Sequence, residues 1–167
     1  MVYTELCHHG IKGQRWGIRR YQNPDGSLTS AGQKRYSKEY DTNLTKAASN
    51  VTKNASSRYV KAWNKAADDV NNDLIDKYNK KHDPKDSDYE EKYESMFEEL
   101  MVHYYNKMLL DEIRNDSNYK KAKDIYSKYK DLKISEAGLS ANREFDETEK
   151  SVNSFNRKEF EKKYGLD

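Results

Sequence analysis

Apolar side chains recur every third or fourth residue along the first half of the chain, and this spacing restricts the fold most. An α-helix turns once in about 3.6 residues, so side chains at these intervals share one face. The stripe covers about forty residues and predicts a mainly α-helical protein. Its members are Tyr36, Tyr40, Leu44, Ala47, Val51, Ala55, Tyr59, Trp63, Ala67, Val70, Leu74 and Tyr78.

Two positions interrupt or end this stripe. Short polar side chains at 54–57 compete for backbone hydrogen bonds, so the segment is either one long helix or two helices broken there. Pro84 disfavours helix for the residue before it, and it ends the segment near His82.

The next helix begins with a capping-box pattern, Ser87 followed three residues later by Glu90. Its stripe is the most apolar in the chain, and we expect it to form the core. Polar residues at 115–118 break this helix and cap the following one. The stripe contains Tyr89, Tyr93, Met96, Phe97, Leu100, Met101, Tyr104, Met108 and Ile113.

A third stripe and one last, less regular helix complete the chain. The third stripe contains Tyr119, Ala122, Tyr126 and Tyr129, with Ile125 and Leu132 beside it. Residues 133–142 lose periodicity, and the last helix carries Phe145, Val152, Phe155 and Phe160. Hydrophobic residues make up only 34% of the chain, against about 45–50% in an average domain, which predicts a thin core. Tyrosines fill many stripe positions and leave hydroxyls for partners.

The first thirty residues differ from this body in glycine content, because five of the seven glycines precede residue 33. The sequence Asn23-Pro24-Asp25-Gly26 is a strong turn signal between two short strands, 16–22 and 27–29. We therefore predict a glycine-rich, basic and aromatic hairpin module at 1–30 and a helical domain at 31–167. The fold class is mainly α: a small N-terminal β-hairpin followed by an elongated three- to five-helix bundle. Trp16, Ile18 and Leu28 are the expected contacts between hairpin and helices.

The hairpin carries arginines interleaved with aromatic residues, which is the first candidate partner-binding site. Such side chains dominate protein interfaces, and they also clamp phosphates and stack on bases. A solvated rim that keeps the hairpin soluble is the other interpretation. The candidate residues are Arg15, Trp16, Arg19, Arg20 and Tyr21.

The second candidate site is an acidic helix face. Residues 1–36 hold six basic and two acidic side chains, whereas residues 83–118 hold four basic and eleven acidic ones. Such a face is either simply solvated or mimics nucleic-acid charge and occupies a basic groove on another protein. The candidate residues are Glu90, Glu91, Glu94, Glu98 and Glu99.

The sequence gives little evidence for catalytic residues, a metal site or a cofactor site. Cys7, His8 and His9 are adjacent, but structural zinc needs about four ligands, and His82 and His103 stand far along the chain. No phosphate-binding glycine loop and no His-Glu-x-x-His pattern occurs. We therefore expect a non-enzyme with no cofactor and no metal.

The chain shows no apolar run of the roughly 20 residues needed to cross a bilayer, and its first residues lack the pattern of a secretory signal. Its single cysteine excludes a disulfide framework within the chain. We therefore expect the protein to be kept in a reducing compartment and to be neither secreted nor in a membrane.

Residues 8–36 follow the pattern His-x-Gly-x-x-Gly-x-x-Trp-Gly-x-Arg-Arg-Tyr-Gln-Asn-x-Asp-Gly-x-Leu-Thr-x-x-Gly-x-x-Arg-Tyr. This segment resembles a short module of tailed-bacteriophage and prophage proteins of Gram-positive bacteria. Those proteins are head, minor structural or uncharacterised proteins. The resemblance implies phage origin, virion association and a location in the bacterial host cytoplasm or the virion, and it carries over no catalytic residue. The resemblance does not extend to the helical body.

Three functions follow as hypotheses. The first is a non-enzymatic phage-derived interaction protein, structural or virion-associated, whose partner is a phage or host protein. The second is a phage inhibitor of a host defence system, similar to an anti-CRISPR protein, that acts through the acidic helix face. The third is a nucleic-acid-binding accessory protein that uses the basic aromatic hairpin. A homo-oligomer is compatible with each of them.

Overall fold

A computed structural model describes residues 20–129 and 131–167 and confirms a mainly helical fold. A π-helical turn, η1 (Val70–Leu74), joins α2 to α3. The α-helices are α1 (Ser30–Lys53), α2 (Ala55–Asp69), α3 (Ile75–Lys81), α4 (Tyr89–Asn115), α5 (Ser117–Lys128), α6 (Glu136–Ser154) and α7 (Arg157–Lys163).

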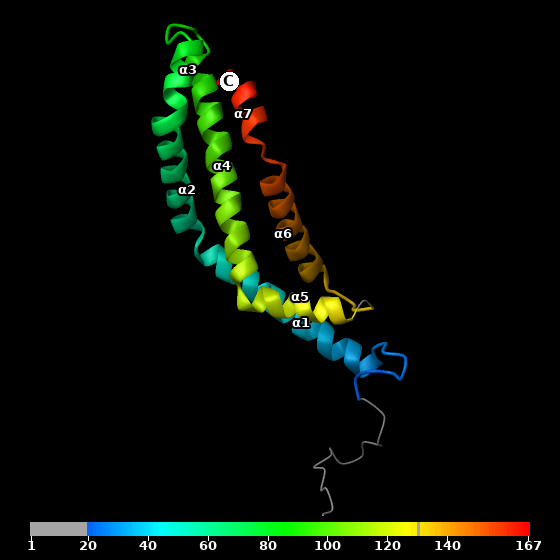
Figure 1. Cartoon of the computed structure of the whole chain (residues 1–167). Helices are drawn as coiled ribbons and strands as arrows, with labels where there is room; N and C mark the ends of the chain where they lie inside the picture. The colour runs from blue at the N-terminus through cyan, green and yellow to red at the C-terminus, as the bar shows by residue number, and fades with distance from the viewer. Residues whose placement is uncertain (1–19, 130) are drawn as a thin grey trace, which may run out of the picture.

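The helices build an elongated body with two packed regions (Figure 1). Helices α2, α4 and α6 run as three neighbouring columns, which α3 and α7 extend at one end. Helices α1 and α5 pack together at the other end. One hydrophobic cluster joins α1, α5 and α6 around Leu44 and Phe145, and a second joins α2, α4 and α7 around Leu100 and Phe160. The long helix α4 contributes to both clusters and connects the two regions.

The long first stripe is two helices, because α1 ends at Lys53 and α2 begins at Ala55. The phase of the stripe in α2 differs from the prediction: Tyr59 and Trp63 are exposed, whereas Arg58, Ala62 and Ala66 are buried. The buried face itself continues in register across Asn54, because Arg58 follows Val51 by about two helical turns, whereas the predicted stripe stepped from Ala55 to Tyr59.

The π-helical turn η1 keeps one face of the α2–α3 segment buried. Four residues of an α-helix rotate about 40° beyond one full turn, so a stripe with only four-residue steps drifts around the helix. A π-helical turn holds more residues than an α-helical one and cancels part of this drift. The buried residues at this spacing are Arg58, Ala62, Ala66, Val70, Leu74 and Tyr78.

Two helix boundaries agree with the predictions, and the capping prediction for α4 does not. Helix α3 ends at Lys81, before Pro84. Helix α5 starts at the predicted break, where the Asp116 carboxylate accepts hydrogen bonds from the backbone N–H groups of the first turn. The capping box at Ser87 is wrong, because the N-cap of α4 is Asp88. The Asp88 side chain makes no capping bond and instead pairs with Lys92 at 2.7 Å.

The C-terminal part contains two helices where one was predicted. Helix α6 begins at Glu136, inside the segment expected to be irregular, because the Ser135 hydroxyl accepts a bond from the Gly138 N–H. It ends before Phe155, and the Asn156 side chain then caps α7. Both helices pack along α4 (Figure 1).

The predicted N-terminal β-hairpin is not supported. The turn is present, with Gly26 at φ 88° and its N–H donating to the Asn23 carbonyl at 3.0 Å. Its arms meet only at one antiparallel bridge between Gln22 and Leu28, and the described part of the chain contains no strand. The returning arm is short because the next residue, Thr29, is already the N-cap of α1. The predicted strand residues 16–19 lie outside the described residues.

None of the helices in the described part of the chain is both long and apolar enough to span a membrane.

Candidate interaction surfaces

The turn at 20–29 is packed against the helical body. Leu28 is buried in the cluster of α1, α5 and α6, which confirms it as a docking contact. The Leu28 N–H donates to Asp131 Oδ2 at 3.3 Å, and Gln33 Nε2 donates to the Asp131 carbonyl at 2.6 Å. The other two expected contacts, Trp16 and Ile18, lie outside the described residues. The boundary between module and helical domain at residue 30 stays a prediction.

Gly32 allows this close packing because it has no side chain. A Cβ at this position would lie 2.1 Å from the Tyr21 carbonyl oxygen and 3.2 Å from Leu28 Cδ2. The Tyr21 carbonyl also accepts a hydrogen bond from the Thr29 N–H at 3.2 Å. The first turn of α1 and the start of the 20–29 turn are therefore in direct backbone contact.

Two arginines and two tyrosines meet at this end of the molecule. The guanidinium carbons of Arg20 and Arg35 lie 5.4 Å and 4.7 Å from the centre of the Tyr21 ring, within the range of cation–π interactions. The Tyr36 ring meets Tyr21 edge-on and stacks on Tyr129 at 4.4 Å. We call Arg20, Tyr21, Arg35 and Tyr36 the basic aromatic end. The other candidates, Arg15, Trp16 and Arg19, lie outside the described residues.

The five candidate glutamates of α4 divide into two groups. Glu90, Glu91, Glu94 and Glu98 are exposed, and none forms an ion pair with any residue that the structure describes. Glu99 instead accepts bonds from Lys163 Nζ at 2.5 Å and the Tyr164 hydroxyl at 2.9 Å, so it holds the C-terminal segment against α4. We call the first four the acidic row.

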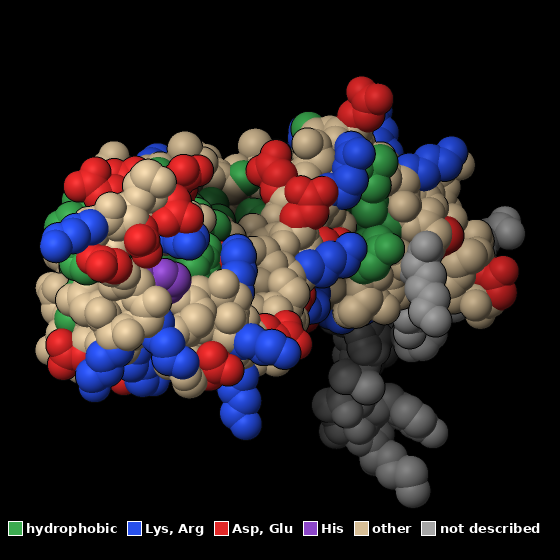
Figure 2. Space-filling model, turned by 90° about the horizontal axis from the view of Figure 1, so that it is seen from above, with side chains coloured by type: hydrophobic (Ala, Val, Ile, Leu, Met, Phe, Trp, Pro, Cys, Tyr) green, Lys and Arg blue, Asp and Glu red, His purple; other side chains and the backbone are tan. Residues whose placement is uncertain are grey.

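Acidic and basic side chains are interspersed over the face shown in Figure 2. The acidic row is therefore a local feature of α4 and not part of a uniformly acidic molecule.

A partly exposed apolar face lies along the line where α2 packs on α4, where Phe97 and Met101 are half-buried against the second cluster. Tyr59 and Trp63 of α2 are 51% and 47% exposed. The Trp63 ring meets the Phe97 ring of α4 edge-on at 5.7 Å, and Met101 follows Phe97 one turn later. We call these four residues the aromatic face. Sequence reasoning missed it because the predicted stripe stepped from Ala55 to Tyr59 and Trp63, which put both side chains inside.

Arg58 occupies the junction of α1 and α2 and is only 3% exposed. Its guanidinium donates to Val51 O at 2.5 Å, to Glu112 Oε2 at 2.8 Å and to the Tyr105 hydroxyl at 3.0 Å. It thereby satisfies a carbonyl at the C-terminal end of α1 and ties both helices to α4. The hydrogen bond from Arg58 lowers the pKa of Glu112.

A pocket of about 340 Å³ opens between α4 and the turn that joins α6 to α7. His103 lines it and stacks on Phe155 at 3.8 Å between ring centres. Burial lowers the pKa of His103, and the cations Lys107 and Arg157 lower it further, whereas Asp69 opposes them. The buried Nδ1 atom of His103 has no hydrogen-bond partner among the described residues.

The lowered pKa of His103 predicts a pH-dependent stability. The His103 ring binds a proton less readily in the folded state than in the unfolded state. The contribution of neutral His103 to stability is therefore complete above pH 6.5, its ordinary pKa, and is lost as the pH falls through its lowered pKa. Thermal melting of the wild type should weaken from pH 7.5 to 5.5, whereas His103→Phe, which keeps the stacking, should show a shallower slope. Equal slopes for both proteins would contradict this prediction.

No group of three or more potential metal ligands is assembled within residues 20–129 and 131–167. Cys7, His8 and His9 fall outside these ranges. His82 is used otherwise, since its ring stacks on Tyr78 and its Nε2 lies 3.0 Å from the Tyr164 carbonyl.

The comparisons with known proteins gave no match: no family model matches the chain, and neither a curated protein nor a solved structure matches it. The function is therefore argued from the residues and their arrangement.

Proposed function

We propose that this is a non-enzymatic, phage-derived interaction protein, structural or virion-associated, that docks through its basic aromatic end. One observation carries the proposal. The Tyr21 ring contacts its neighbour Arg20 and also Arg35 and Tyr36, which stand at the far end of the phage-like pattern. Gly32, which belongs to the same pattern, permits the close approach.

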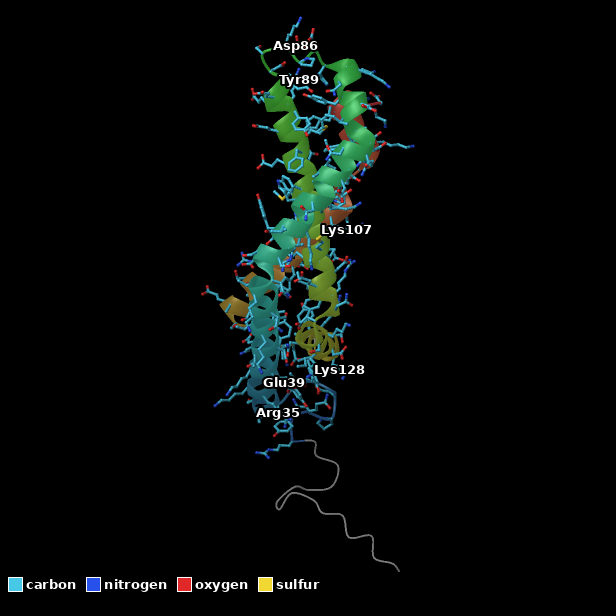
Figure 3. All side chains as sticks on the ribbon, turned by 90° about the vertical axis from the view of Figure 1, so that its left-hand side faces the viewer. Arg35, Glu39, Asp86, Tyr89, Lys107 and Lys128 are labelled. Atoms are coloured by element: carbon cyan, nitrogen blue, oxygen red, sulfur yellow. The ribbon has the colours of Figure 1, made fainter. Side chains whose placement is uncertain are left out.

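The chemistry of this end suits a protein interface. Arginine and tyrosine are enriched among residues that dominate binding energy. Both arginines are exposed, and Leu28 anchors the turn in the core, so the group is presented on a packed support. Figure 3 shows Arg35 and Glu39 near one end of the molecule and Asp86 and Tyr89 near the other. A partner at the basic aromatic end thus leaves the acidic row accessible.

The test is mass spectrometry of purified phage particles. We expect the wild type in the particles and at least about tenfold less of the variant Arg20→Glu/Arg35→Glu, as for loss of dominant interface residues. The variant Lys46→Glu/Lys150→Glu makes the same charge change at exposed positions of α1 and α6 and should be incorporated normally. Absence of the wild type from particles, or normal incorporation of the first variant, would refute the proposal.

The unpaired acidic row supports a second candidate function, inhibition of a host defence system in the manner of an anti-CRISPR protein. Its carboxylates are free to occupy a basic groove of a defence enzyme in place of nucleic acid. In an assay with a purified CRISPR effector nuclease, Glu94→Lys/Glu98→Lys should abolish inhibition. Inhibition that survives this change, or none by the wild type, counts against the candidate.

A further inference from the structure

We infer that the aromatic face of α2 and α4 is a docking site for a basic amphipathic helix of a partner protein. The inference rests on the proposal that this protein binds other proteins. It also deepens the second candidate function by naming the chemistry that the surface around the acidic row recognises.

The apolar side chains of this face form two short parallel rows. Tyr59 and Trp63 are one turn apart on α2, and Phe97 and Met101 are one turn apart on α4. The Trp63–Phe97 contact brings the rows together where the two helices pack. Val60, next to Tyr59, is 56% exposed and widens the face. Tryptophan and tyrosine are the residues most enriched at the centres of protein interfaces.

The rest of the described fold leaves this face open. Helices α6 and α7 lie on the other side of α4 from α2, as Figure 1 shows. His103 of α4 stacks there on Phe155, and Glu99 binds Lys163 there. Tyr59, Val60 and Trp63 of α2 remain exposed, and an exposed apolar group of this kind is a feature of binding surfaces.

The acidic row forms one rim of the aromatic face. At about 100° per residue, Glu94 lies roughly 20° from Met101 around α4, and Glu98 lies roughly 60° from it. Both carboxylates are exposed and make no ion pair with described residues. Lysines or arginines on an occupant gain attraction here, whereas an acidic occupant is repelled. Charge complementarity therefore selects a basic partner.

Helical side-chain spacing matches this surface better than the alternatives do. An amphipathic helix presents apolar side chains at i, i+3, i+4 and i+7, which suits rows of side chains one turn apart. Its flanking lysines and arginines would lie over Glu94 and Glu98. A nucleic acid is a poor occupant, because its phosphates would meet the acidic row. A basic groove shaped only for nucleic acid would leave Trp63 and Phe97 without apolar contacts.

The test uses the fluorescence of Trp63. The chain has two tryptophans, so Trp16→Phe leaves Trp63 as the single reporter in the full-length protein. The probe is an 18-residue helical peptide with a leucine stripe and lysines on its other faces. We expect saturable binding and a shift of the Trp63 emission to shorter wavelength as the ring becomes covered. A peptide with glutamates in place of the lysines should not bind.

Variants on both sides of α4 decide whether the binding is specific. In the Trp16→Phe background, Glu94→Lys/Glu98→Lys should weaken binding at least tenfold. Glu144→Lys/Glu147→Lys makes the same charge change on exposed positions of α6 and should bind as before. Circular dichroism confirms that each variant is helical. The inference is overturned if the acidic peptide binds equally, if both double variants behave alike, or if the Trp63 emission shifts with protein concentration alone, which would show a second copy as occupant.

Peptide binding without inhibition of a defence enzyme would reject the second candidate function and leave this inference intact.

Discussion

Replacing Arg58 by alanine is expected to lower the free energy of unfolding by about 3 kcal/mol, because it removes one partner of a buried ion pair. The guanidinium bridges Val51 O, Glu112 and the Tyr105 hydroxyl. Its loss leaves the Val51 carbonyl and the Glu112 carboxylate without this donor. The Glu112 side chain is 33% exposed and keeps some water, so we expect the lower part of the range for buried pairs.

Chemical denaturation of Arg58→Ala and of Asn64→Ala, a control at an exposed position of α2, measures this effect. The control should change stability by less than about 0.5 kcal/mol. The bond to Arg58 lowers the pKa of Glu112. The contribution of this ion pair to stability is therefore present above pH 4.5, the ordinary pKa of the carboxyl group, and is lost as the pH falls through the lowered pKa. The difference between wild type and Arg58→Ala should therefore shrink in acid. A loss as small as that of the control would contradict the role given to Arg58.

Replacing Gly32 by alanine is expected to detach the 20–29 turn from α1. The new Cβ would lie 2.1 Å from the Tyr21 carbonyl oxygen, a backbone atom that cannot move without the turn. Detachment exposes Leu28, at a cost of about 2 kcal/mol, which the better helix propensity of alanine offsets by about 1 kcal/mol. The expected net loss in the free energy of unfolding is therefore only about 1 kcal/mol. Incorporation into phage particles should nevertheless fall at least about tenfold, because Arg35 of α1 no longer contacts the Tyr21 ring.

Hydrogen exchange separates this effect from general unfolding. In Gly32→Ala the Leu28 N–H, which donates to Asp131, should lose protection, whereas amides of α4 should keep theirs. Lys34→Ala, on an exposed position of the same helix, should leave both protected. Full protection of Leu28 in Gly32→Ala would show that the turn tolerates the side chain.

Much of the helical fold could be predicted because helix breaks depend on local chemistry. Pro84 and the residues at 115–118 act on their own backbone or on the adjacent turn, and both breaks are present. The weak point at 54–57 was also visible, although the sequence left open whether the helix continued through it. Periodicity within α1 correctly placed Tyr40 and Leu44 in the core.

Features that depend on distant contacts could not be predicted. The burial of Arg58 in place of Tyr59 depends on Glu112 and Tyr105, which lie opposite it. The hairpin is not supported because Thr29 already caps α1, which leaves the returning arm too short to form a second strand.

Prediction of the candidate sites was limited in the same way, because their arrangement depends on contacts between distant residues. The run of glutamates was visible in the sequence, but the assignment of Glu99 to Lys163 required the fold of the C-terminal segment. Arg35 was visible as part of the pattern at 8–36, whereas its position over the Tyr21 ring depends on the close contact at Gly32. The exposure of Trp63 followed from the phase of α2 and had no signal in the stripe.

Cross-linking on intact particles tests most directly whether the basic aromatic end is the docking site. A photoreactive amino acid is placed at Tyr21 in one protein and, as a control, at Leu139, an exposed apolar position on α6, in another. Both proteins are produced during phage growth, and the purified particles are irradiated and analysed by mass spectrometry. The proposal predicts cross-links to a phage protein from position 21 and none from position 139. Cross-links from position 139 alone, or from neither position, would contradict it.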